Sequence, residues 1–280
     1  MTPEHGPVGL TELPIGIFDS GMGGLTVLRA LRERLPQERW LYLGDTARLP
    51  YGTKGPETVA RYAVQAASHL VARGIKMLVI ACNTASAVAM PRLSKEFTSL
   101  PVIGVVEAGA MAAINASKSG HIAVLATEST VRGGTYKRAI QSQRGDAQVF
   151  SQACSLFVAL AEEGWIKGPL VEAVVREYLQ PMLEEKKRQG LDCLVLGCTH
   201  FPLLKDTIAH VAGPGVVLVD SSETVARAVE KFLHQSNLAR TSGSGDAHFL
   251  ATDSAERFAR IGSLFLGEPV NLQDVELVNL

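Results

Sequence analysis

The sequence predicts an α/β fold of two similar domains, each a mostly parallel β-sheet flanked by helices. Short apolar runs alternate along the chain with stretches of helical periodicity, a pattern typical of βα units. Two of these runs end in a cysteine with polar residues behind it, at Cys82 and Cys198, which indicates an internal repeat. The 280 residues are 46% hydrophobic, enough for ample cores. We expect a pseudo-twofold relation between the domains and an active site in the cleft between them.

The first half of the chain contains four strand-like runs and two segments of helical periodicity. A strand at 15–18 ends at Asp19 and a glycine-rich turn, and leucines at helical spacing follow from Leu25 to Leu35. Flanking Gly and Pro residues mark several of the other runs as strands bounded by turns. The predicted strands are 40–43, 77–81 and 102–106, and the predicted helix is 57–72.

The second half repeats this alternation. Its predicted strands are 122–126, 193–196 and 216–219, and its predicted helices are 130–141, 169–188 and 222–234. Pro169 suits the first turn of a helix, whereas Pro181 should kink or interrupt it. The Ser- and Gly-rich segment 237–245 is read as a surface loop.

The domain boundaries follow from these elements. We expect the chain to cross to the second domain near Glu107 and to return near Ser221, so that the last segment packs on the first domain. Residues 1–106 and 222–280 would then form the first domain, and residues 107–221 the second.

Composition and charge disfavour several classes of partner. The net charge is −1 and the one short basic cluster, 186–188, reads as a solvated helix end, so no nucleic acid is expected. Residues 1–11 lack the pattern of a signal peptide, and no apolar run reaches the ~20 residues that a membrane helix needs. Four cysteines without a CxxC motif favour a cytoplasmic protein.

The paired cysteines indicate acid–base chemistry. A thiol between the end of a strand and the start of a helix has free amides and a positive dipole end beside it, which favour its thiolate. Asn83 and Thr84, like Thr199 and His200, are polar residues placed where a ligand carboxylate could bind. Two such thiols facing one cleft could deprotonate a stereocentre on one face and reprotonate it on the other.

Other interpretations of the same residues are open. Cys82 could be a buried structural thiol, and Asp19 could be a helix N-cap. His200 with Cys198 could be half of a zinc site, although no second compact Cys/His pair completes it. The turn 19–24 is neither a GxGxxG motif nor a P-loop. We therefore expect no metal and no cofactor, and core roles for Cys154 and Cys193.

Five motifs, in order, resemble those of the bacterial glutamate racemase family: GIFDSGMGGLTVL, YLGDTARLPYGTK, LVIACNTASA, ATESTVRGGTY and LVLGCTHFPLL. Their strand-end sequences differ from those of aspartate and hydantoin racemases, which share the two-cysteine fold. The resemblance implies cofactor-independent interconversion of L-glutamate and D-glutamate. It also implies that the product D-glutamate supplies the peptidoglycan stem peptide.

The resemblance also implies residue roles. The catalytic cysteines correspond to Cys82, which would act on D-glutamate, and Cys198, which would act on L-glutamate. Asp19 and His200 would assist them, and Glu162 matches a family carboxylate near the histidine, with Glu163 an alternative register. The implied substrate-binding residues are Asp19, Ser20, Tyr51, Gly52, Asn83, Thr84, Thr130, Thr199 and His200.

Three other functions are consistent with the sequence. The first is a racemase of another amino acid or of a hydantoin. The second is a cysteine hydrolase with a covalent acyl intermediate, which leaves the second cysteine unexplained. The third is a binding module without catalysis. The sequence leaves open the oligomeric state, for which a homodimer is one candidate, as well as regulation by a cell-wall precursor and the role of the N-terminal residues.

Overall fold

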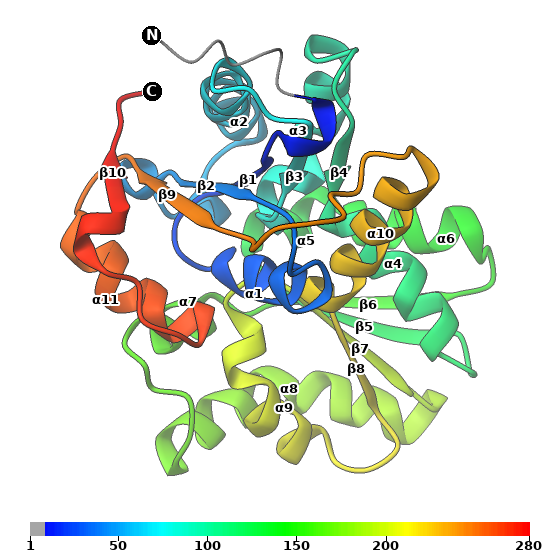
Figure 1. Cartoon of the computed structure of the whole chain (residues 1–280). Coiled ribbons are helices and arrows are strands. Elements are labelled where there is room, and N and C mark those ends of the chain that lie inside the picture. Colours follow the sequence, from blue (N-terminus) through cyan, green and yellow to red (C-terminus); the bar gives the residue numbers. More distant parts are fainter. Residues whose placement is uncertain (1–8) are drawn as a thin grey trace, which may run out of the picture.

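A computed structural model describes residues 9–280, with side chains outside 185–189. The N-terminal residues 1–8 and the basic side chains at 186–188 therefore lie outside the described part. The chain forms two separate sheets in which every strand pair is parallel (Figure 1). The first has the order β10-β9-β2-β1-β3-β4. Its strands are β1 (Ile15–Asp19), β2 (Trp40–Gly44), β3 (Met77–Ile80), β4 (Val102–Gly104), β9 (Ala247–Ala251) and β10 (Val275–Leu277).

The second sheet repeats the central topology of the first. Its order, β6-β5-β7-β8, matches β2-β1-β3-β4 strand for strand. The predicted two-part parallel α/β fold is thereby confirmed. The strands are β5 (His121–Ala126), β6 (Gln148–Ala153), β7 (Cys193–Gly197) and β8 (Val217–Asp220).

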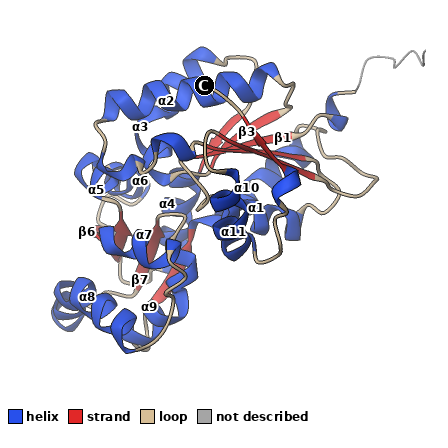
Figure 2. Ribbon diagram, turned by 90° about the vertical axis from the view of Figure 1, so that its left-hand side faces the viewer, coloured by secondary structure: helices blue, strands red, loops and turns tan. Residues whose placement is uncertain are grey.

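Helices cover both faces of the first sheet, because its central strands bury side chains on both sides. One face packs on α2 and α3, and the other on α1, α10 and α11 (Figure 2). These helices are α1 (Leu25–Arg34), α2 (Pro56–Ala72), α3 (Asn83–Glu96), α10 (Ser221–Gln235) and α11 (Ala255–Leu266).

The second sheet is covered in the same way. One face packs on α7, α8 and α9, and the other on α4 and α6, with α5 leading into α6. Within residues 9–280, no helix is both long and apolar enough to cross a bilayer. These helices are α4 (Val105–Ala116), α5 (Glu128–Gly133), α6 (Thr135–Gln143), α7 (Ser155–Glu162), α8 (Pro169–Gln189) and α9 (Lys205–Ala212).

Three predicted elements differ from the structure. The run 102–106 is a strand only to Gly104, because α4 begins at Val105. The predicted helix 130–141 is two helices, divided at Gly134, whose φ of 62° is left-handed. The expected interruption at Pro181 is wrong: α8 continues through it, held against the sheet by the buried Leu179 and Met182 on either side.

The C-terminal segment returns to the first sheet, where β9 pairs with β2 and β10 pairs with β9. We did not predict these two strands or β6, because each includes exposed or half-buried residues that interrupt the apolar pattern. Before that return, α10 packs on α1 and α4. The Ser222 hydroxyl of α10 donates to Thr26 Oγ1 of α1 at 3.3 Å, so this helix connects the two halves.

Candidate active site

A cavity of about 290 Å³ lies between the carboxyl ends of the two sheets, and both Cys82 and Cys198 line it. A larger, more open groove of about 1040 Å³ lies along α3, α4 and α10, and neither cysteine lines that groove. Ten of the predicted site residues line the smaller cavity: Ser20, Tyr51, Gly52, Cys82, Asn83, Thr84, Glu162, Cys198, Thr199 and His200.

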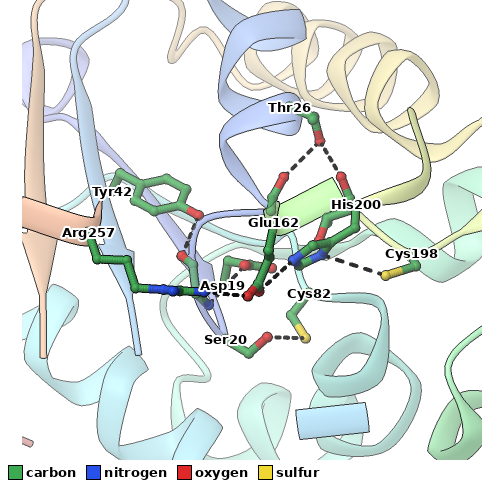
Figure 3. Close-up of polar contacts among 12 residues, drawn as sticks. Asp19, Ser20, Thr26, Tyr42, Cys82, Glu162, Cys198, His200 and Arg257 are labelled. Atoms are coloured by element: carbon green, nitrogen blue, oxygen red, sulfur yellow. Dashed lines mark hydrogen bonds and ion pairs between the residues drawn. The ribbon is translucent and has the colours of Figure 1, made fainter. Parts of the chain in front are cut away.

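Cys82 lies where two neighbouring strands of the first sheet end. β1 ends at Asp19 and the adjacent β3 leads into Cys82, which is the place where open parallel sheets bind ligands. Cys82 caps α3, and its Sγ accepts a hydrogen bond from the backbone N–H of Ala85 at 3.4 Å. The thiol donates to Ser20 Oγ at 3.5 Å (Figure 3).

The electrostatic surroundings make Cys82 a neutral thiol. Burial raises the pKa of Cys82 to about 12, Asp19 adds to the rise, and the hydrogen bonds that Cys82 forms with Ser20 and Ala85 do not offset it. The expected effect of the helix terminus is present, because the Ala85 N–H lowers the pKa, but burial outweighs it. Burial also raises the pKa of Asp19. Burial therefore favours the protonated form of both Asp19 and Cys82.

Asp19 lies behind the cavity and is not part of its lining. It is fully buried, and its Oδ2 accepts the backbone N–H of Gly21 at 3.0 Å. Its Oδ1 has no hydrogen-bond partner among residues 9–280. A buried carboxylate oxygen without a partner is costly, so Asp19 is a group that can take up or share a proton beside Cys82.

The glycines after Asp19 allow the two halves to approach each other. A Cβ on Gly23 would lie 2.5 Å from His200 Nδ1 and 2.5 Å from Thr199 Oγ1. Thr26, one turn later, places its hydroxyl 3.1 Å from the carbonyl oxygen of Thr199. This turn thus fits against the strand end that carries Cys198.

Cys198 follows β7 and has a different set of partners. The chain turns through a short 3₁₀ helix, Phe201–Leu204, before α9 begins, so the α-helix start expected directly after Cys198 is absent there. The nearest polar partner is His200, whose Nδ1 lies 3.8 Å from Cys198 Sγ. His200 Nε2 donates to Glu162 Oε1 at 3.2 Å.

The surroundings of His200 favour its protonated form. Burial lowers its pKa, but the hydrogen bonds to Cys198 and Glu162 outweigh burial and raise the pKa to about 10. Burial raises the pKa of Glu162, yet the interactions with His200 and Arg257 lower it overall. An imidazolium held by a carboxylate therefore faces the sulfur of Cys198.

Polar groups between the two cysteines can bind a carboxylate. The Tyr136 hydroxyl donates to Asn83 Oδ1 at 2.6 Å, which leaves the amide Nδ2 of Asn83 without a hydrogen-bond partner among residues 9–280. The Thr84 hydroxyl joins those of Thr127, at 2.9 Å, and Thr130, at 3.4 Å. Thr130 itself does not line the cavity and contacts it through the other two threonines.

The turn that carries Tyr51 and Gly52 closes the cavity from the first half. The Tyr51 ring is buried and its hydroxyl donates to Asp45. A Cβ on Gly52 would lie 2.7 Å from Thr127 Cβ, so only glycine allows this turn to approach the second half. Tyr51 and Gly52 line the cavity together with Asn83 and Thr84.

The sequence interpretation missed several residues of the site. Thr127 follows β5, the strand equivalent to β1, and that equivalence was the signal that could have identified it. Arg257 binds Glu162 from a distant part of the chain (Figure 3), and no local pattern marks it. Among residues 9–280, no three His, Cys, Asp or Glu side chains gather to hold a metal ion.

Comparison with known proteins identifies the family of this chain. The model of the Asp/Glu/Hydantoin racemase family matches residues 24–229. A glutamate racemase of Geobacter metallireducens is 49% identical over 95% of this chain and 96% of its own length. One of Neisseria meningitidis is 44% identical over 96% of this chain and 97% of its own.

Solved structures agree over the whole fold. Glutamate racemase of Thermus thermophilus, in complex with β-chloro-D-alanine, superposes with a TM-score of 0.86 at 42% identity, covering 96% of this chain and 98% of that one. The Francisella tularensis enzyme, in complex with D-glutamate, gives 0.88 at 35% identity with the same coverage. The chain belongs to the Asp/Glu/Hydantoin racemase family and, within it, to the glutamate racemases, which are isomerases.

Proposed function

We propose that this chain interconverts L-glutamate and D-glutamate by a two-base mechanism in which Cys82 and Cys198 are the bases and acids. The observation that carries the proposal is the placement of both thiols in one cavity, at equivalent strand ends of the two sheets. A substrate held between them presents opposite faces of its α-carbon to the two sulfurs. Racemisation needs that arrangement.

The proposed reaction on L-glutamate begins at Cys198. Its thiolate removes the α-proton, and the neutral Cys82 thiol delivers a proton to the opposite face of the carbanion. The site ends with Cys198 protonated and Cys82 ionised, which is the form that accepts D-glutamate. In each direction the α-carbon loses one proton to one sulfur and gains one proton from the other, so the reaction is balanced in protons.

The unlike partners of the two thiols support this assignment. The His200 imidazolium, 3.8 Å from Cys198 Sγ, can stabilise negative charge on that sulfur. Asp19 next to Cys82 keeps that thiol protonated and can take up its proton when the reaction runs from D-glutamate. We propose Asp19, His200 and Glu162 as the groups that assist catalysis.

The carbanion is the energetic obstacle, because its charge develops next to the α-carboxylate. Hydrogen-bond donors aimed at that carboxylate disperse the charge, and they act strongly in a closed cavity. We propose Asn83, Thr84 and Thr199 for this role, since their polar groups line the cavity between the sulfurs. The other proposed substrate contacts are Ser20, Tyr51, Gly52, His200 and, through its neighbours, Thr130.

Two thiols and their partners supply both proton transfers, so we propose that the reaction needs no cofactor. We also propose that the enzyme acts in the cytoplasm, since its four cysteines lack a CxxC motif, and that its D-glutamate enters the peptidoglycan stem peptide. The two domains are proposed to comprise 1–106 with 222–280, and 107–221.

The proposed activity is tested by chiral analysis of either glutamate enantiomer incubated with the purified protein after dialysis against EDTA, without pyridoxal phosphate. We expect both incubations to reach an equal mixture. Aspartate and a hydantoin serve as comparison substrates, and faster turnover of either would contradict the substrate assignment. A mass shift from an acyl adduct on cysteine would instead support a hydrolase.

A further inference from the structure

Arg257 reaches the Cys198 half of the site from the other half of the molecule. It lies on α11, in the C-terminal segment whose strands return to the first sheet. Its Nη2 donates to Glu162 Oε2 at 2.9 Å, and Glu162 ends α7, which packs on the second sheet. This ion pair therefore crosses between the two halves beside the cavity.

The contacts form one continuous series that ends at sulfur. Arg257 occupies Oε2 of Glu162, so Oε1 is left for His200 Nε2 at 3.2 Å. The other ring nitrogen of His200, Nδ1, lies 3.8 Å from Cys198 Sγ. The exposed fraction of the side chain falls along the series, from 41% for Arg257 to 14% for Glu162 and 9% for His200.

A carboxylate with a partner on each oxygen has a fixed orientation, and a histidine ring held at one nitrogen presents the other in a fixed direction. The same helix supports the ring a second time. Phe265, two turns after Arg257 on α11, packs edge-on against the His200 ring, with the ring centroids 5.0 Å apart. Two side chains of α11 thus support His200, Phe265 by contact with its ring and Arg257 through Glu162.

We propose that Arg257 is a positioning residue for proton transfer at Cys198, acting through Glu162 and His200. This inference rests on the proposed racemase function. Arg257 does not line the substrate cavity, so it contacts neither the substrate nor the sulfur. The competing view is that Arg257 only holds the two halves together and has no selective effect on either half-reaction.

The test is the variant Arg257→Met, which keeps most of the apolar stem and removes the charge and the hydrogen bonds. Because the equilibrium constant between enantiomers is one, kcat/KM must fall by the same factor in both directions. We expect a loss of roughly fivefold, the scale of one partly exposed charged hydrogen bond, carried mainly by kcat.

Isotope effects separate positioning from simple support. Slowing the step at Cys198 makes proton removal from L-glutamate more rate-limiting and proton removal from D-glutamate less so. The primary deuterium isotope effect on kcat/KM should therefore rise with α-deuterated L-glutamate and fall with α-deuterated D-glutamate. Arg257→Lys, which restores the charge without the planar fork, should lie between the wild type and Arg257→Met.

Arg34→Met is the matched control. Arg34 is equally exposed, at 41%, and also forms an ion pair between helices, with Glu230 at 2.6 Å. That pair lies outside the cavity lining, so the control should leave both isotope effects unchanged. Urea unfolding of each variant measures any loss of stability separately.

Unchanged isotope effects in Arg257→Met and Arg257→Lys, in a protein whose wild type racemises glutamate, would overturn the positioning role and leave the proposed function standing. Changes of the same sign in both directions would also overturn it. A wild-type protein that does not racemise glutamate would remove the proposed function, and the inference with it.

Discussion

The chemistry of this molecule is decided by residues at the carboxyl ends of equivalent strands. Asp19 is the last residue of β1 and Thr127 directly follows the equivalent β5, while Cys82 lies two residues after the end of β3 and Cys198 directly follows β7. The two sulfurs occupy matching places, but one lies by a buried carboxyl and the other by an imidazole. The fold thus provides the symmetry that a racemase needs, and single residues make its two half-sites chemically distinct.

Replacing either sulfur by oxygen should abolish racemisation. Cys82→Ser and Cys198→Ser put a far weaker acid in the place of the thiol, and loss of general acid–base catalysis is expected to cost at least about 10³-fold in kcat/KM. Activity is measured with each enantiomer, and circular dichroism checks the fold. Full turnover by either variant would refute the two-base mechanism.

The assisting residues should affect opposite half-reactions. Asp19→Asn slows proton transfer at Cys82 and should raise the primary deuterium isotope effect on kcat/KM with α-deuterated D-glutamate. His200→Asn slows transfer at Cys198 and should raise the effect with α-deuterated L-glutamate. If both variants show equal effects in both directions, Asp19 and His200 only bind substrate.

At the scale of elements, the turns that bring the two halves together matter as much as the helices and strands. The turn after β1 approaches the strand end at His200 so closely that a side chain on Gly23 has no space. Helix caps and strands could be predicted from local patterns, but this approach depends on the packing of two segments about 180 residues apart in the sequence. The sequence showed a glycine-rich turn, and only the structure shows what it contacts.

Gly23→Ala tests the role of this turn. The added Cβ would lie 2.5 Å from His200 Nδ1, so the ring must leave its present position beside Cys198. We expect a loss in kcat/KM of more than about tenfold and a destabilisation of about 1–3 kcal/mol. Gly145→Ala is the control, since its nearest new contact is at 4.0 Å. Equal activity of the two variants would show that the turn does not position His200.

At the scale of the whole molecule, the predicted repeat and the alternation of strands and helices were correct because burial on both faces of a parallel sheet leaves a clear apolar pattern. The strands β9 and β10 and the link from Arg257 to Glu162 were not predictable. Both strands include exposed residues, which interrupt the apolar pattern, and an ion pair between distant segments has no local signal. The sequence identified Cys82 as a candidate base from the polar residues that follow it. Its raised pKa depends on burial, which only the structure shows.

Stability should depend on pH through the buried thiols. Burial raises the pKa of Cys82 and of Cys193 to about 12, whereas an unfolded thiol ionises near ~8.5. Their contribution to stability is complete below that pH and is lost as the pH rises toward 12. Between pH 9 and 10.5, as rough bounds, each thiol should lower the free energy of unfolding by about 1.4 kcal/mol per pH unit.

Cys193→Ala isolates one thiol, because Cys193 lies in β7 outside the cavity. Urea unfolding across this pH range should give a shallower decline for the variant than for the wild type, by about 1.4 kcal/mol per pH unit. Parallel declines would mean that the folded protein does not hold the proton on Cys193.

The central claim, that two different groups remove and return the α-proton, is tested most directly in heavy water. L-glutamate is incubated with the enzyme and the reaction is stopped at low conversion. The two enantiomers are then separated, and mass spectrometry measures the deuterium content of each. We predict D-glutamate with one α-deuterium and remaining L-glutamate that keeps its α-protium, because Cys198 takes the substrate proton and Cys82 delivers a solvent-derived deuteron. D-glutamate that retains the original protium would show that one group both removes and returns the proton, and would contradict the account.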